Sequence, residues 1–194
     1  MTNDTAAGTR GPYAKGVRRR REILDKTLDV VASRGIDGTS LRAIGEAIGV
    51  SHAALTHYFD SREALLVEVL RERDVESTRR VQGIDGVLER MTAAADDNAK
   101  VPGLVTLYTN MLATAVEPGN DVSREFFVER FESGRATLAR ELREQLEASG
   151  RHSDTDLELV GSLIMAAFDG LQVQWLLDRR IDIAGTLALL QRLL

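Results

Sequence analysis

The stretch SLRAIGEAIGVSHAALTHYF, residues 40–59, constrains the fold more than any other part of the chain. Ser40 and Ser51 each precede a short run of helix-forming residues, and a serine hydroxyl at this position accepts a hydrogen bond from a free backbone N–H group of the first helical turn. Gly49 lies between the two runs, where a helix commonly ends in a left-handed residue. The sequence therefore predicts two short helices joined by a tight turn, which is the helix-turn-helix arrangement.

The second of these short helices has two different faces. At about 100° of rotation per residue, Leu55 and Phe59 share one face, while Ala53 and His57 lie on the opposite one. Small methyl groups can approach a thymine methyl in the DNA major groove, and Thr56 or His57 can reach base edges. The pattern therefore favours one buried face and one face that reads DNA.

The two histidines of this helix also raise the possibility of a metal site. His52 and His57 are five residues apart, which places them about 140° apart around a helix, whereas zinc-binding pairs occupy one face at positions i and i+4. The third histidine, His152, stands in a polar loop. The chain has no cysteine, no nucleophile with a neighbouring base and no phosphate-binding loop. We therefore expect no metal, no cofactor and no catalytic residues.

The rest of the 194-residue chain also reads as helical, with only three prolines and no alternating strand pattern. A first helix is expected from about Val17 to Arg34, and a fourth is expected to be capped by Asp60, with Glu63 completing a capping box. Further helices are predicted over 84–96, 102–117, 121–149, 155–178 and 183–193, which makes an all-α fold of about nine helices. We expect no apolar run long enough to span a membrane and no secretory signal, and therefore a cytoplasmic location.

Basic residues gather at the N-terminal end of a chain whose net charge is −5. Residues 1–21 contain six basic side chains and one acidic side chain, and residues 1–16 read as a flexible arm. A basic end on an acidic body is typical of a protein that contacts a polyanion at one end only. A solvated tail without a partner is the alternative.

The segment GIDGTSLRAIGEAIGVSHAALTHYFDSREALL, residues 35–66, together with the preceding REILDKTLDVVASRG, resembles the TetR family of bacterial transcriptional regulators. The segment AAFDGLQVQWLLD is similar to the penultimate helix of many members. The resemblance implies a three-helix DNA-binding domain at residues 17–62, joined to a larger helical domain for ligand binding and dimerisation at residues 63–194.

The resemblance also implies which residues contact DNA. Positions expected to touch phosphates, sugars or bases are Ser40, Arg42, His52, Ala53, Ala54, Thr56, His57, Tyr58 and Arg62. Family members commonly have tyrosine at the position of Thr56 and often have a Gly-Thr pair near Ala53 and Ala54. Arg62 stands where the family usually has a phosphate-binding lysine. The operator sequence therefore cannot be carried over from relatives, and the two arginines could also be ordinary surface charges.

The back two-thirds of the chain are expected to dimerise and to bind a ligand. The resemblance implies pairing through helices 155–178 and 183–193, which carry apolar residues that need burial: Leu157, Val160, Ile164, Phe168, Leu171, Leu176, Ile183, Leu187, Leu190 and Leu194. Some of them must belong to the monomer's own core. Candidate pocket residues are Leu104, Leu107, Tyr108, Met111, Phe127, Phe131, Met165, Asp169 and Trp175. The spacing of the first four equally fits a plain core helix.

Asp169 is the only charged residue in the apolar stretch LVGSLIMAAFDGLQVQWLL. A buried carboxylate needs a partner. An arginine of the same chain, a hydrogen bond across a dimer interface and a cationic or hydroxylated ligand all remain open at this stage.

Taken together, the sequence predicts a homodimeric, ligand-responsive regulator, most simply a repressor that binds a palindromic operator in double-stranded DNA and is released by a small apolar or amphipathic molecule. One alternative is a small helical ligand carrier or enzyme in which the helix-turn-helix is only scaffold. Another is a DNA-binding protein without a small ligand.

Overall fold

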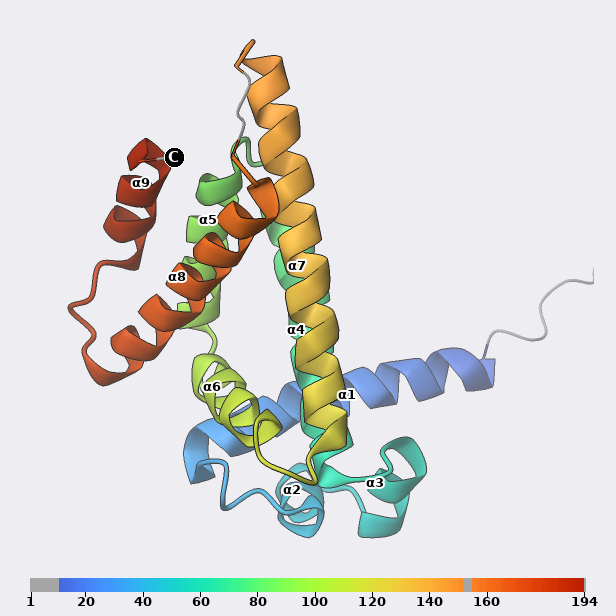
Figure 1. The fold of residues 1–194 in the computed structure, drawn as a ribbon. Coiled ribbons are helices and arrows are strands. Elements are labelled where there is room, and N and C mark those ends of the chain that lie inside the picture. Colours follow the sequence, from blue (N-terminus) through green and yellow to red (C-terminus); the bar gives the residue numbers. More distant parts are fainter. Residues whose placement is uncertain (1–10, 152–154, 194) are drawn as a thin grey trace, which may run out of the picture.

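The computed structural model describes residues 11–151 and 155–193. Within these ranges all regular secondary structure is helical, which confirms the all-α fold class (Figure 1). The helices are α1 (Gly11–Arg34), α2 (Leu41–Ile48), α3 (His52–Tyr58), α4 (Arg62–Val81), α5 (Val87–Lys100), α6 (Leu104–Ala115), α7 (Asp121–Ala148), α8 (Leu157–Leu177) and α9 (Ile183–Leu193). His152 and Leu194 lie outside the described residues.

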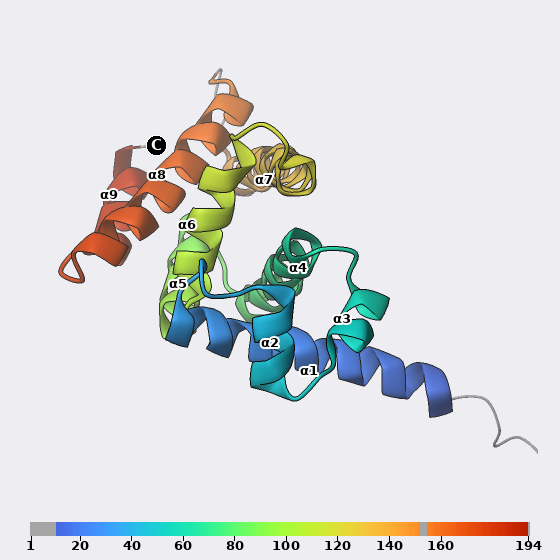
Figure 2. The same ribbon diagram turned by 90° about the horizontal axis from the view of Figure 1, so that it is seen from below.

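The first helix is longer than predicted. It begins at Gly11 instead of near Val17, so residues 11–16 of the expected arm are helical, and residues 1–10 lie outside the described ranges. Ion pairs to α4 hold its middle part: Arg20 pairs with Glu68, and Arg21 reaches Glu72 at 2.7 Å. Two residues of the basic cluster are therefore turned toward α4. The N-terminal end of α1 projects beyond α3 (Figure 2).

The turn between α2 and α3 is built from short-range contacts. The Ser40 hydroxyl accepts a hydrogen bond from the N–H of Ala43, and the Ser51 hydroxyl accepts one from Ala54, both at 3.1 Å. Gly49 has φ +71°, which favours glycine. A side chain on Gly45 would lie 2.6 Å from the carbonyl oxygen of Val50, so only glycine allows the chain to return this closely. Both predicted serine caps and the glycine turn are confirmed.

The start of α4 differs from the prediction. Ser61, not Asp60, is the N-cap, and its hydroxyl accepts a hydrogen bond from the N–H of Ala64 at 2.9 Å. Glu63 does not complete a capping box, because its carboxylate accepts a hydrogen bond from the backbone N–H of Ser123 at 2.8 Å. Glu63 thereby joins the start of α4 to the first turn of α7, a contact between residues 60 positions apart.

One hydrophobic core extends from the front helices into the body. Its fully buried members come from α1, α2, α3, α4 and α6 and include Ile23, Leu28, Ile44, Leu55, Leu65 and Leu107. Two smaller clusters join α5 to α7, α8 and α9. Helices α4 and α7 run along each other through the molecule, and α5, α8 and α9 cover the far end from α2 and α3 (Figure 1). The position of α3 is therefore coupled to the body by direct packing.

Helix α8 corrects the expectation that no apolar run is long enough for a membrane span. It has 21 residues and reaches a mean hydropathy of 1.3, so length and composition alone would allow it to cross a membrane. In the fold it packs against α7 and α9, with Ile164, Phe168 and Leu171 buried inside the molecule. This packing accounts for part of the apolar character of α8. The rest lies in exposed side chains such as Leu159 and Leu163.

Candidate functional site

The outer face of α3 carries the predicted base-reading residues. His52, Ala53, Thr56 and His57 are exposed, whereas Leu55 is fully buried behind them. The Thr56 hydroxyl donates to the carbonyl of Ala53 at 3.0 Å, which leaves its oxygen able to accept. The helix therefore presents small and hydrogen-bonding groups on one side while its other side anchors it in the core.

Tyr58 and Phe59 are adjacent in the sequence but differ in burial. Phe59 is buried, and the guanidinium of Arg20 lies 5.2 Å from its ring centre. Tyr58 is half-buried and packs edge-on against the His57 ring, with 5.5 Å between ring centres. This contact orients the two aromatic side chains at the C-terminal end of α3.

The two arginines of the predicted DNA-contact set have different surroundings. Arg42 is exposed and pairs with Glu46, one turn along α2, at 2.9 Å. Arg62 is half-buried and donates to the carbonyl oxygens of Thr39 at 2.6 Å and Ile36 at 2.5 Å. Its guanidinium therefore fastens the segment between α1 and α2 to the start of α4. The motif position alone did not reveal this contact, because the partners lie 23 and 26 residues away.

The body contains a pocket between α4, α5, α7 and α8, which we call the central pocket. Its volume is about 340 Å³, and its wall includes Asp74, Arg90, Met91, Ala94, Arg130, Glu141, Met165, Phe168 and Asp169. A second hollow of about 500 Å³ lies at the far end of the body, lined by residues such as Leu142, Leu146 and Val160. The central pocket gathers the charged side chains, so we take it as the candidate binding site even though it is the smaller of the two.

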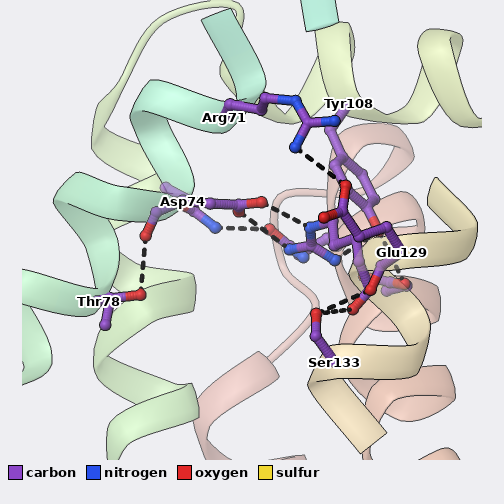
Figure 3. A network of polar contacts seen from close by, with 10 residues as sticks. Arg71, Asp74, Thr78, Tyr108, Glu129 and Ser133 are labelled. Atoms are coloured by element: carbon purple, nitrogen blue, oxygen red, sulfur yellow. Dashed lines mark hydrogen bonds and ion pairs between the residues drawn. The ribbon is translucent and has the colours of Figure 1, made fainter. Parts of the chain in front are cut away.

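Polar contacts connect four helices, α4, α6, α7 and α8, at one wall of the central pocket (Figure 3). The Tyr108 hydroxyl donates to the Asp169 carboxylate at 3.0 Å, and Arg130 donates to the same hydroxyl oxygen at 3.1 Å. Arg130 also pairs with Asp74 on α4 at 2.9 Å. Asp169 thus has a protein partner within its own chain, and that partner is a tyrosine, whereas an arginine of the same chain was one of the three possibilities left open by the sequence.

Burial perturbs the acid–base behaviour of these groups. Burial raises the pKa of the Asp169 carboxyl above its ordinary value of 3.8, and the charge of Arg130 and the hydrogen bond from Tyr108 oppose this rise. Burial also raises the pKa of the Tyr108 hydroxyl, so tyrosine remains the donor. For Arg130, burial alone would lower the pKa, but the Asp74 carboxylate beside it raises the pKa overall. Arg130 is therefore a permanent cation.

The nine predicted pocket residues do not surround one cavity. Met165 and Asp169 line the central pocket. Leu104, Leu107, Met111 and Phe127 are buried in the main core, and Phe131 packs against it. Tyr108 and Leu104 border a void of only about 20 Å³. Trp175 lies in a separate cluster with the Arg179 guanidinium 3.5 Å from its ring centre. The helical spacing of these residues reflects core packing, as it does in most amphipathic helices.

Several residues of the central pocket were missed by reading the sequence. Arg130 follows Phe126 and Phe127 by four and three residues, which places it on the same buried face of α7. A charged residue on an apolar face was the signal that identified Asp169, and it would have identified Arg130 as well. Within the described residues, no three His, Asp or Glu side chains come close enough together to hold a metal ion.

Comparison with known proteins gives one consistent result. The family model of bacterial regulatory proteins of the tetR family matches residues 23–69. The HTH-type transcriptional repressor Rv1474c of Mycobacterium tuberculosis is 31% identical over 156 residues, which cover 79% of this chain and 80% of that protein.

Solved structures agree on the fold. A TetR-family transcriptional regulator from Rhodococcus sp. superposes with a TM-score of 0.72 at 22% identity, covering 90% of this chain and 95% of that one. A transcriptional regulator from Saccharomonospora viridis in complex with choline superposes with a TM-score of 0.68 at 21% identity, covering 91% and 95%. With the helix-turn-helix geometry and the match along most of the repressor's length, this chain belongs to the TetR family of bacterial transcriptional regulators.

Proposed function

We propose that the protein is a cytoplasmic homodimeric repressor that binds a palindromic operator and is released by a small molecule. The observation that carries the proposal is the exposed face of α3, where His52, Ala53, Thr56 and His57 stand clear of the core while Leu55 holds the helix in place. Residues 17–62 would form the DNA-binding domain and residues 63–194 the regulatory and dimerisation domain. Ser40, Arg42, Ala54 and Tyr58 complete the proposed contacts around α3.

Dimerisation through α8 and α9 is supported by an exposed apolar stripe. Leu159, Leu163, Val173 and Leu177 are all exposed, and at 100° per residue they lie within about 80° of one another around α8. Leu189 and Leu193 add exposed apolar side chains from α9. Of the apolar residues expected either to pair or to belong to the monomer's own core, Ile164, Phe168, Leu171, Ile183 and Leu187 are buried within the monomer, and the exposed stripe consists of other residues. Such a stripe on two adjacent helices is typical of a subunit interface.

The central pocket is the proposed effector site, and α4 would transmit its occupancy. Helix α4 is tied to the DNA-binding half by Arg20 and Arg21 and to α7 by Arg130 and Glu63. A ligand against the pocket wall would change the preferred position of α4 and hence the spacing of the two α3 helices in the dimer. A ligand that binds the non-operator arrangement better shifts the population away from DNA binding.

A gel-shift experiment with DNA from the promoter region next to the gene tests the proposal. We expect a shift whose affinity falls steeply with salt, because phosphate contacts release counterions. The same DNA with one half-site scrambled should bind more weakly if a dimer reads a palindrome. Absence of a shift at low salt would contradict DNA binding, and equal affinity for the intact and scrambled sites would contradict dimeric readout.

Two single variants separate base reading from phosphate binding. His57→Ala removes an exposed group of α3 and should alter preference among operator sequences. Arg42→Ala removes an exposed cation of α2 and should weaken all sequences about equally, lowering the salt slope by about 1. Identical behaviour of the two variants would contradict this division of roles.

A further inference from the structure

The charges on the wall of the central pocket do not balance. Arg90 pairs with Glu141 at 2.6 Å, and Arg130 pairs with Asp74 at 2.9 Å. Both arginines thus have a carboxylate of their own. Asp169 is a third carboxylate of the same wall, and among the described residues no cation pairs with it. The pocket therefore carries one more acidic side chain than basic side chains.

The protein satisfies Asp169 only in part. A carboxylate has two oxygens that accept hydrogen bonds, and within the described residues the Tyr108 hydroxyl, at 3.0 Å from Oδ2, is the donor. Arg130 donates to the tyrosine oxygen at 3.1 Å, so its charge reaches Asp169 through Tyr108 and without a direct bond. A charge removed from water in this way is costly unless a partner of opposite sign or a proton compensates it. Asp169 thus has unused capacity to pair with a cation.

Part of the remaining wall of the central pocket suits apolar substituents around such a cation. Met91, Ala94, Met165 and Phe168 line it, and they come from α5 and α8. Thioether sulfur is polarisable and adapts to irregular shapes, and an aromatic ring face attracts cations. A volume of about 340 Å³ falls at the lower end of the range of small-molecule pockets.

We propose that the central pocket binds a small organic cation, an amine or quaternary ammonium with apolar substituents, whose charge lies against Asp169. The proposal rests on the proposed function, since it names the chemical class of the effector of that site. An anionic effector is disfavoured because it would have to displace Glu141 or Asp74 from the two arginines. A neutral apolar effector would cover the Asp169 carboxylate without supplying a partner beyond Tyr108.

Calorimetry with three probes of similar size tests the charge preference. Phenyltrimethylammonium and tert-butylbenzene share one shape and differ in charge, and phenylacetate supplies the opposite charge. We expect the cation to bind at least about tenfold more tightly than the neutral probe, because its charge is attracted to the Asp169 carboxylate, and phenylacetate to bind most weakly. Equal affinities, tighter binding of phenylacetate, or no binding of the cation would overturn the proposal.

Variants assign that preference to Asp169. In Asp169→Asn the affinity for phenyltrimethylammonium should fall to that for tert-butylbenzene, while the neutral probe is unaffected. Tyr108→Phe keeps the carboxylate and should keep the preference for the cation, which provides a second reading if Asp169→Asn folds poorly. Glu158→Gln removes an exposed carboxylate of the same helix and should leave all three affinities unchanged. An unchanged cation preference in Asp169→Asn, or its loss in Tyr108→Phe or Glu158→Gln, would overturn the assignment.

Gel shifts on the same preparations keep this inference separate from the proposed function. If the protein binds operator DNA but shows no preference for the cation, the effector class is wrong and the regulator proposal stands. If it prefers the cation through Asp169 but binds no DNA, the site stands and the regulator proposal is wrong. Release of operator DNA by phenyltrimethylammonium from the native protein, but not from Asp169→Asn, would support both.

Discussion

The outer face of α3 and the wall of the central pocket use polar side chains in opposite ways. Around α3 the fixing contacts are local, since each serine cap bonds a backbone group three residues away and the outward side chains remain exposed. In the central pocket the polar groups are joined across helices: Arg90 and Glu141 are 51 positions apart in the sequence, and Tyr108 and Asp169 are 61 positions apart. A surface that reads another molecule can thus be specified locally, whereas an internal pocket depends on how distant helices come together.

The largest expected effect is a loss of stability when the buried side chain that anchors α3 is shortened, compared with a change on the exposed face of the same helix. Leu55→Ala removes a fully buried side chain and should lower the free energy of unfolding by about 3 kcal/mol. His57→Ala, two residues later on the exposed face, should change it by less than about 0.5 kcal/mol while altering operator preference. Urea unfolding and gel shifts of both variants measure the two effects. A large loss of stability in His57→Ala would show that the two faces are not independent.

A smaller effect is expected where the two regions meet, at Arg62. Arg62→Lys keeps the charge but cannot reproduce the forked contacts to Thr39 and Ile36, so we expect a loss of about 2 kcal/mol in the free energy of unfolding. Arg42→Lys, on an exposed side chain, is the control and should cost almost nothing. If Arg62→Lys unfolds like the native protein but binds DNA more weakly, Arg62 acts through phosphate and not through the segment between α1 and α2.

The smallest expected effect is a gain in the free energy of unfolding at neutral pH when asparagine replaces Asp169. Because burial raises its pKa in the folded chain, the folded state holds the proton more tightly than the unfolded state. This tighter proton binding contributes fully to the free energy of unfolding below the ordinary pKa of 3.8, and the contribution is lost as the pH rises through the raised pKa of Asp169 in the folded state. Asp169→Asn should therefore match the native protein in acid and exceed it by up to about 1 kcal/mol at neutral pH.

Urea unfolding of both proteins at a series of pH values from acid to neutral measures this difference. Tyr108, Arg130 and Asp74 are the charged or titratable groups that face Asp169, and they are the same in both proteins. Glu158→Gln on the exposed side of α8 is the control for loss of a carboxylate. A stability difference that shrinks as the pH rises would contradict the role assigned to burial.

Helix positions followed from the sequence wherever the deciding contacts are short-range. Ser40, Gly49 and Ser51 fix α2, the turn and α3 through groups within five residues, and the structure has these elements where the sequence predicts them. Errors arose where two nearby residues could each cap a helix: Ser61 and not Asp60 begins α4, because Ser61 is the residue with extended backbone and a hydroxyl within reach of Ala64. Glu63 was then free to bond Ser123 on α7.

By itself the sequence determined the all-α fold, the helix-turn-helix, the exposed set on α3 and the anomaly of Asp169, because periodicity and capping act within one or two helical turns. Only the tertiary structure decided that Arg20, Arg21 and Arg62 serve contacts within the chain, that Tyr108 is the partner of Asp169, and that most of the predicted pocket residues fill the core. A charged residue in an apolar stretch indicates from the sequence that it needs a partner, but the packing of distant helices determines which residue is that partner.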